Sequence, residues 1–198
     1  MTVSPSTRPE ADLRGAMTLE DVLSQRRSVR HYTGRALSED EILQLCWAAQ
    51  GITHPAGYRT APSAGALYPL ELGVATAAGW FVYDPPHHRL MRRSPDDLRP
   101  AIRWAALSPE AVGDSPAVFV IAAVPAPTAG KYGDARGARY VHLEAGHAAQ
   151  NLLLEATALG LGAVPIGAFD DARVREVLDL SGDHDVLYLI PVGEPASP

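Results

Sequence analysis

Apolar residues in the first third of the chain recur at helical spacing in one clear segment. Between residues 39 and 50 they return every three to four positions, which predicts an amphipathic helix. A capping box that opens at Ser38 marks its start, and Gly51 marks its end. A shorter helix is expected after Thr18, where a hydroxyl precedes two acidic residues. Residues 52–69 have the composition of a loop.

Strand-like patterns follow in the middle of the chain. Residues 70–76 and 80–84 predict two strands joined by a turn, and a third strand is expected around residues 90–91. Ser94-Pro95-Asp96-Asp97 resembles a helix start and predicts a helix that begins there. Residues 117–124 are almost continuously apolar, which is typical of a strand buried on both faces.

The last third predicts a loop over residues 125–137 and then the longest helix, over residues 139–160. Gly160 and Gly162 end that helix, and a short apolar strand or loop follows at residues 163–169. A helix capped by Asp170 and a buried strand over residues 185–192 complete the pattern. Because strands and helices interleave without a regular repeat, the sequence predicts an α+β fold with a mixed sheet.

Composition limits the possible partners. The chain has 198 residues and a net charge of −6, so neither nucleic acid nor an anionic membrane is an expected partner. Its one cysteine, Cys46, lies on the apolar face of the 39–50 helix and is expected in the core. Residues 1–16 are polar and predict a disordered leader, and residues 17–198 predict a single domain. These features together favour a cytoplasmic protein.

Two segments carry candidate chemistry. Arg26-Arg27-Ser28-Val29-Arg30 places three guanidinium groups within five residues, a density that suits a phosphate. Residues 61–69, APSAGALYP, form a loop of small residues that lets the backbone approach a flat ligand. Alone, a basic cluster is more often a solvated surface, and such a loop is more often a turn. Together they indicate a pocket for a phosphorylated, planar cofactor.

Several other patterns carry less weight. The histidine pairs 87–88 and 142/147 lack the spacing of metal ligands, so no metal is expected. Gly160-x-Gly162 follows a helix instead of a strand, which argues against a dinucleotide-binding turn. Glu144 and Gln150 are either ligands or polar positions on the long helix.

Four ordered segments resemble motifs of the flavin-dependent nitroreductase superfamily. RRSVR at 26–30 is similar to its first motif, and PSAGALYP at 62–69 is similar to the second, in the form found in the SagB-type dehydrogenase branch. LEAGH at 143–147 with QNL at 150–152, and GLGAVPIG at 160–167, resemble the same branch. The similarity spans residues 19–193 in the family's order.

This resemblance implies a nitroreductase-like fold, with a mixed, mainly antiparallel sheet flanked by helices, in an interlocked homodimer. FMN is implied at the subunit interface. The arginine segment would hold its phosphate, ribityl chain and pyrimidine edge, and residues 62–65 would pack on the partner's flavin. Backbone N–H groups near Gly167 would face flavin N5 and O4. The cofactor-binding residues expected on this basis are Arg26, Arg27, Ser28, Arg30, Pro62, Ser63, Ala64, Gly65, Gln150, Pro165, Ile166, Gly167 and Ala168.

Lys131-Tyr132 is the candidate catalytic pair. It precedes Gly133 in the expected loop and resembles a Lys-Tyr pair of the azoline oxidases in this branch, where the pair is proposed to remove a substrate proton. A lysine in a dry pocket can serve as such a base, although a loop lysine is more commonly solvated. One departure from the family is the C-terminus, which lacks the basic tail of many nitroreductases, so Arg136 and Arg139 are further candidates for the phosphate.

Three functions remain open at this point. The first is an FMN-dependent dehydrogenase that converts azolines to azoles in natural-product maturation and needs no nicotinamide. The second is a generic NAD(P)H-driven reductase of nitro compounds or quinones. The third is a non-catalytic scaffold that binds flavin or a partner protein.

Overall fold

The structure is a computed structural model that describes residues 17–107 and 109–196. The expected leader, residues 1–16, lies outside the described residues. The helices are α1 (Leu19–Gln25), α2 (Glu39–Gln50), α3 (Arg99–Ala105), α4 (Pro109–Gly113), α5 (Ala126–Tyr132), α6 (Asp134–Ala158) and α7 (Asp171–Val177). The strands are β1 (Leu70–Thr76), β2 (Gly79–Asp84), β3 (Arg89–Ser94), β4 (Ala117–Ala123), β5 (Gly162–Ala163) and β6 (Asp185–Gly193). Two short 3-10 turns, η1 (Ala64–Ala66) and η2 (Pro85–His87), complete the set.

The strands form one six-stranded sheet in the order β3-β2-β1-β4-β6-β5, and each neighbouring pair is antiparallel. Strand β4 is buried at every position, as its continuous apolar run predicts. Its residues alternate between two cores. Phe119 and Ile121 pack in the core that α2 and α6 cover, while Val118 and Val120 pack in the core that α3, α4 and α7 cover. The α+β class expected from the sequence is confirmed.

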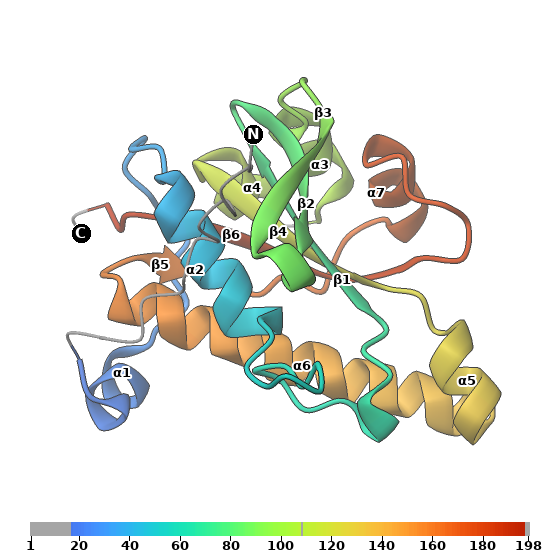
Figure 1. Ribbon diagram of the computed structural model, residues 1–198. Helices are drawn as coiled ribbons and strands as arrows, with labels where there is room; N and C mark the ends of the chain where they lie inside the picture. Colours follow the sequence, from blue (N-terminus) through green and yellow to red (C-terminus); the bar gives the residue numbers. More distant parts are fainter. Residues whose placement is uncertain (1–16, 108, 197–198) are drawn as a thin grey trace, which may run out of the picture.

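Helix α6 is the longest element, and it crosses beneath the sheet together with α2 (Figure 1). It has 25 residues, which correspond to about 37 Å of helix. Helix α1 lies near its C-terminal end, whereas α5 and η1 lie near its N-terminal end (Figure 1). The opposite ends of this helix therefore support different parts of the sequence. Cys46 of α2 is fully buried in the core above it, and this burial raises the pKa of the thiol.

Two expectations about helix boundaries are wrong. The helix expected from Ser94 begins at Arg99, because polar side chains close a turn ahead of it: Ser94 Oγ accepts from Asp96 N at 3.1 Å, and Asp97 Oδ1 accepts from Arg99 N at 3.1 Å. The loop expected over residues 125–137 instead contains α5 and the first turn of α6.

Small residues explain the second error. The glycines and alanines of this segment resemble a loop in the sequence, yet they let two helices pack closely. A Cβ built on Gly137 of α6 would lie 2.7 Å from the Cα of Ala129 in α5. Gly133, with φ 79°, makes the bend between the two helices. Lys131 and Tyr132 therefore lie on a helix and not on a loop.

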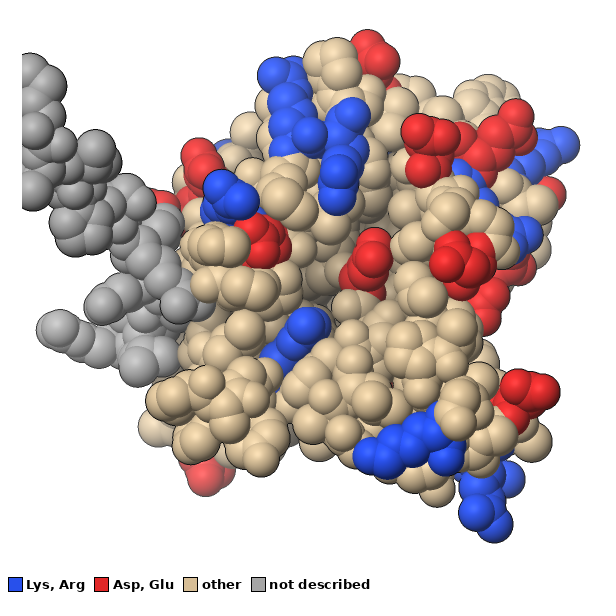
Figure 2. All heavy atoms as spheres, turned by 45° about the vertical axis from the view of Figure 1, so that its right-hand side comes forward, with Lys and Arg blue, Asp and Glu red and all other residues tan. Residues whose placement is uncertain are grey.

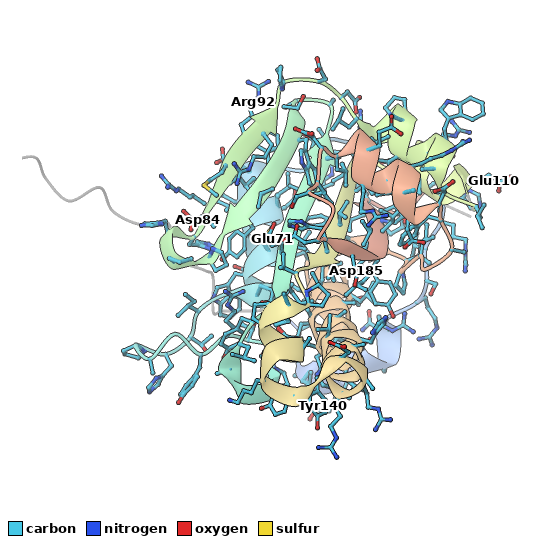
Figure 3. All side chains as sticks on the ribbon, turned by 90° about the vertical axis from the view of Figure 1, so that its right-hand side faces the viewer. Glu71, Asp84, Arg92, Glu110, Tyr140 and Asp185 are labelled. Carbon is cyan, nitrogen blue, oxygen red and sulfur yellow. The ribbon has the colours of Figure 1, made fainter. Side chains whose placement is uncertain are left out.

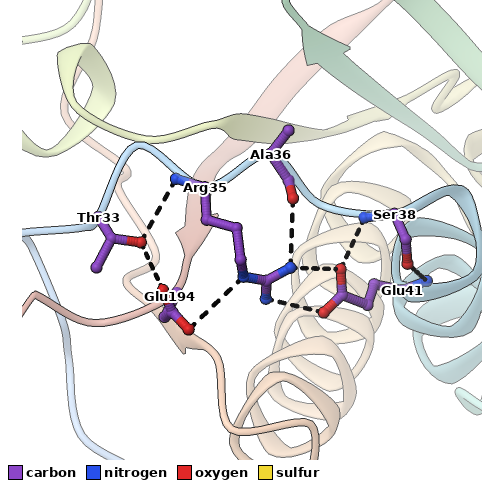
Figure 4. A network of polar contacts seen from close by, with 6 residues as sticks. All are labelled: Thr33, Arg35, Ala36, Ser38, Glu41 and Glu194. Atoms are coloured by element: carbon purple, nitrogen blue, oxygen red, sulfur yellow. Dashed lines mark hydrogen bonds and ion pairs between the residues drawn. The ribbon is translucent and has the colours of Figure 1, made fainter.

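A polar network fixes the chain that follows the arginine cluster (Figure 4). Arg35 binds both carboxylate oxygens of Glu41, at 3.2 and 2.9 Å, and lies 3.6 Å from Glu194 at the end of β6. Glu41 also completes the capping box with Ser38. The Thr33 hydroxyl donates to Glu194 at 2.7 Å. This network joins the segment after the cluster to α2 and to the last strand.

Candidate active site

The arginine segment lies against the short strand β5. Val29 N donates to Ala163 O at 3.0 Å, and Ser28 forms a parallel bridge with Ala163. The absence of a side chain at Gly162 makes room for Val29, because a Cβ built there would lie 2.6 Å from the Val29 Cβ. The structure thus brings together two motifs, 26–30 and 160–167, that are far apart in the sequence.

The guanidinium groups of this segment are available to an anion. The Arg27 side chain turns back toward the end of α1, where its Nη1 donates to Ser24 O and Arg26 O at 2.9 and 2.8 Å. Within residues 17–107 and 109–196, no carboxylate pairs with Arg26, Arg27 or Arg30. Ser28 and Arg30 are exposed. Unpaired cations beside an exposed hydroxyl suit a phosphate dianion.

Residues 165–168 form a ledge beyond β5, and its outer residues, Gly167 and Ala168, are exposed. Ile166 is tied to Leu189 by two backbone hydrogen bonds of 2.8 and 3.0 Å, and Ala168 O accepts from Leu107 N at 3.0 Å. Gly167 and Ala168 are exposed, and their N–H groups donate to no acceptor in the part of the chain described here. A Cβ on Gly167 would meet nothing within 4 Å. Pro165 is half-buried beside them. Two adjacent amides are therefore free to bind a ligand.

The second motif forms a strained turn around η1. Gly65 has φ 66°, and the non-glycine residues Ala66 and Tyr68 have φ 54° and 50°. Side chains hold this conformation in place. Tyr68 N donates to Ser63 Oγ at 2.9 Å, and the Tyr68 hydroxyl accepts from Arg59 N at 3.1 Å. The Arg59 guanidinium also lies 4.7 Å from the centre of the Tyr68 ring. Such left-handed residues tend to occur at functional sites.

Lys131 and Tyr132 lie against this turn. A Cβ on Gly65 would lie 2.5 Å from Lys131 Nζ and 2.7 Å from the Tyr132 hydroxyl oxygen. Lys131 is exposed, Tyr132 is half-buried, and the Tyr132 ring packs edge-on against Tyr140 with centroids 5.0 Å apart. The structure therefore joins the candidate catalytic pair to the second motif, from which it is separated by more than sixty residues.

A hollow opens between strands β1–β3 and the loop that follows α2, and charged residues of both signs, among them Glu71 and Arg93, line it (Figure 2). It has a volume of about 310 Å³. In Figure 3, Glu71 and Asp84 approach it from the sheet, and Tyr140 lies below at the start of α6. Tyr68 of the second motif and Arg59, which precedes that motif, also line it. Tyr68, which closes the turn that carries Gly65, therefore borders space that a small molecule or peptide side chain can enter.

Glu144 is a site residue whose role the sequence left open. It is only 2% exposed, and it lies close to Ser63 and Arg59. Burial raises its pKa to about 7, while the Ser63 hydrogen bond and the Arg59 charge act in the opposite direction. The signal for burial was its place among Val141 and Ala148 on the apolar face of α6. Gln150 is exposed on the same helix.

The two groups of motif residues lie at opposite ends of α6. Ser63 contacts Glu144, whereas the arginine segment lies beside residues that follow the end of the helix. From residue 144 to the helix end at residue 158 the axis rises by about 21 Å. Between them, α6 has an exposed stripe that includes Leu143, His147 and Gln150, and Leu143 is 54% exposed. A single chain thus presents two separated half-sites.

Comparisons with known proteins agree with this architecture. Residues 23–194 match the Nitroreductase family. A Methanocaldococcus jannaschii protein named "Putative nitroreductase" is 43% identical over 181 residues, which are 88% of this chain and 90% of the relative. A crystal structure from Ralstonia eutropha, with the same description, is 29% identical and has a TM-score of 0.86, and it aligns over 99% of this chain and 93% of its own.

A more distant similarity concerns the fold alone. The Escherichia coli microcin synthetase McbBCD complex, solved with truncated pro-MccB17 bound, contains a chain with a TM-score of 0.78 and 21% identity, over 98% of this chain and 79% of that one. Fold, motifs and comparisons together define an oxidoreductase of the FMN-dependent class. The chain belongs to the nitroreductase family.

No helix in the described ranges, 17–107 and 109–196, is both long and apolar enough to span a membrane.

Proposed function

We propose that this chain is a SagB-type dehydrogenase, an FMN-dependent enzyme that oxidises azoline rings to azoles during natural-product maturation. The observation that carries the proposal is the contact of Lys131 and Tyr132 with Gly65. It places a potential base and a hydroxyl beside the loop expected to pack on the flavin. The fold similarity to the microcin synthetase complex is consistent with this activity but shows no more than the fold.

The residues present fit FMN. The guanidinium groups of Arg26 and Arg30, which pair with no carboxylate among the described residues, and the exposed Ser28 hydroxyl would bind the phosphate and the pyrimidine edge. The free amides of Gly167 and Ala168 would face N5 and O4 of the ring. The partner chain would contribute residues 62–65. FMN, when bound, supplies the two-electron acceptor that the protein side chains lack.

The separation of the half-sites supports a homodimer. About 21 Å of helix lies between the Glu144–Ser63 contact and the end of α6, so one chain does not close both motifs around a single ring. A two-fold axis that crosses the exposed stripe of Leu143, His147 and Gln150 would bring each arginine segment toward the partner's second motif. Family members are typically homodimers, which agrees with this arrangement. We also propose a cytoplasmic location, since the single cysteine is buried.

The chemistry assigns separate tasks to the two residues. An azoline that becomes an azole loses two electrons and two hydrogens. One hydrogen would leave a ring carbon with the electron pair, for which bound FMN would supply the acceptor. The other leaves as a proton, which Lys131 takes, while the Tyr132 hydroxyl hydrogen-bonds the ring heteroatom. Dioxygen then accepts the electrons and is reduced to hydrogen peroxide.

The amino-acid composition supports a special role for Lys131. It is the only lysine in the 198-residue sequence, which otherwise has 16 arginines and seven histidines. An arginine stays protonated in proteins, so it serves surface charge but not proton removal. The one side-chain amine of the sequence, that of Lys131, lies in space beside Gly65.

Replacement of Lys131 tests this assignment. Lys131→Ala is expected to keep its bound FMN, and thus the yellow colour of a flavoprotein. It should slow oxidation of a thiazoline-containing synthetic peptide by about 10²–10⁴-fold, the usual contribution of a positioned base. Lys131→Arg, which keeps the positive charge, should be equally slow. Reduction of the flavin by NADPH requires no base and should survive in both variants. Thiazoline turnover at the wild-type rate in Lys131→Arg would refute the proposal.

A generic NAD(P)H-dependent reductase of nitro compounds or quinones is the second candidate. The M. jannaschii relative carries a nitroreductase name, and the exposed ledge at Gly167 leaves the ring accessible to a nicotinamide. Rapid bleaching of the flavin by NADH or NADPH, with quinone reduction and no thiazoline turnover, would favour it. Bound flavin that no donor reduces would favour a non-catalytic scaffold.

A further inference from the structure

The 63–68 turn that contacts the Lys131–Tyr132 pair does not hold its shape by backbone hydrogen bonding alone. Ala66 and Tyr68 sit in the left-handed region at φ 54° and 50°, a conformation that costs roughly 1–3 kcal/mol per non-glycine residue. The Ser63 hydroxyl oxygen accepts from Tyr68 N at 2.9 Å and thereby closes the turn. The orientation of one hydroxyl is therefore central to the shape of the loop.

Glu144 lies next to that hydroxyl. Because the Ser63 oxygen accepts from Tyr68, its proton is left for another acceptor, and the Glu144 carboxylate is close by. Glu144 comes from α6, the same helix that packs against α5 and Lys131. One buried side chain thus links the helix that supports the lysine to the turn that the lysine contacts.

The surroundings of Glu144 also show that it is poised for a charge interaction. Among residues 17–107 and 109–196, its Oε1 atom is buried without a hydrogen-bond partner, and so are Arg59 Nε and Gln50 Nε2. Arg59 attracts the Glu144 charge and stacks on Tyr68, while its Nη1 donates to Gln50 at 2.7 Å. Buried polar atoms that lack a hydrogen bond lower the stability of a protein. A cluster that contains three of them therefore indicates a functional role in addition to a structural one.

We propose that Glu144 is a positioning residue for the Lys131–Tyr132 pair: by holding the Ser63 hydroxyl, its carboxylate fixes the strained turn whose Gly65 sets the place of the lysine amine and the tyrosine hydroxyl. The proposal rests on the function proposed above for that pair. Glu144 itself is expected to touch neither substrate nor flavin. Its effect on the reaction is exerted through Ser63 and the turn.

The single lysine permits a test that needs no substrate. Protein labelled with lysine that carries carbon-13 at Cε gives one lysine resonance, which reports the surroundings of Lys131. Glu144→Ala is expected to shift or broaden this resonance, and Glu144→Gln, which keeps an acceptor for Ser63, should shift it less. Ser63→Ala should reproduce the change seen in Glu144→Ala without disturbing the helix.

Glu155→Ala is the matched control. Glu155 lies on the same helix and also accepts a side-chain hydrogen bond, from Gln44 Nε2 at 2.9 Å, but it has no link to Ser63. Its replacement should leave the Lys131 resonance in place. An unchanged resonance in folded Glu144→Ala, or an equal shift in Glu155→Ala, would overturn the proposal.

Kinetics then separate this proposal from the function on which it rests. Glu144→Ala should lower kcat for the thiazoline peptide by about 10–100-fold per bound flavin, with KM changed less than twofold, because misplacement of a catalytic group slows the chemical step. Glu144→Gln should recover part of the loss. If Lys131→Ala oxidises the thiazoline peptide slowly but Glu144→Ala oxidises it at the wild-type rate, the positioning role of Glu144 is refuted while the proposed function stands. If Lys131→Ala is fast, the function fails, and the resonance still decides whether Glu144 positions Lys131.

Discussion

Gly65 is the residue at which the turn and the proposed catalytic pair meet. Its φ of 66° needs a residue without a β-carbon, and the space where that carbon would be is occupied by Lys131 Nζ and the Tyr132 hydroxyl. Two independent features thus require glycine at this position: the left-handed backbone conformation and the lack of space for a β-carbon. The two can be separated by experiment because another glycine of the chain has only the first.

Gly65→Ala should displace the lysine amine and the tyrosine hydroxyl. The left-handed alanine costs about 1–2 kcal/mol of stability, and thiazoline turnover should fall by about 10–100-fold because the pair moves. Gly57→Ala is the control, since Gly57 has φ 84° but an added Cβ meets nothing within 4 Å. It should show the stability loss without the loss of turnover. Equal turnover in the two variants would contradict the proposed contact.

Glu144 makes a pH-dependent contribution to stability whose sign follows from its surroundings. Burial raises the pKa of this carboxyl from 4.5 to about 7 in the folded protein, so the folded state binds more protons than the unfolded state between these values. The stabilisation from the protonated acid is complete below about pH 4.5 and is lost as the pH rises to about 7. The upper limit of the loss is about 3 kcal/mol, reduced by solvent screening.

Glu144→Gln removes this titration. The free energy of unfolding of the variant minus that of the wild type should therefore increase from pH 5 to pH 8. Urea denaturation at four pH values across this range measures the difference. A difference that stays constant with pH, or that decreases, would show that Glu144 does not titrate as its burial requires.

At the scale of elements, local sequence signals predicted what local interactions determine. The capping box at Ser38, the end of α2 at Gly51 and the buried strand β4 are all as expected, because each depends on a few neighbouring residues or on one apolar run. Helix α5 was missed because its stability depends on tertiary packing against α6 and not on helix propensity. The contact of Lys131 with Gly65 was also beyond the sequence, since the chain brings these residues together only by folding.

The packing of α5 on α6 has its own test. A side chain at Gly137 would collide with the Ala129 backbone, which cannot move as a flexible side chain does. Gly137→Val should cost about 1–3 kcal/mol and slow thiazoline turnover, because α5 carries Lys131. Gly130→Ala, where an added Cβ meets nothing within 4 Å, should be neutral or slightly stabilising. A stable, fully active Gly137→Val variant would show that α5 does not set the position of the lysine.

At the scale of the whole molecule, each active site of the proposed homodimer uses two chains. Arg30 and Gly167 belong to the half near β5, whereas Ala64 and Lys131 belong to the half near the start of α6. If the sites are shared, every dimer has two of them, and each takes one half from each chain. Two variants that each carry a substitution in a different half-site can then form one intact site when they are paired in a mixed dimer.

Mixed dimers test this directly through bound flavin. Arg26→Ala/Arg30→Ala should strip FMN through the loss of two charge-assisted contacts, and Ala64→Trp should block the ring from the other half, so each homodimer is expected to be colourless. When the two variants are unfolded and refolded together in equal amounts, half of the dimers are mixed, and each mixed dimer has one undamaged shared site. Flavin content should therefore recover to about a quarter of the wild-type value. If each chain built its own site, no undamaged site would form in any dimer, and the mixture would stay colourless.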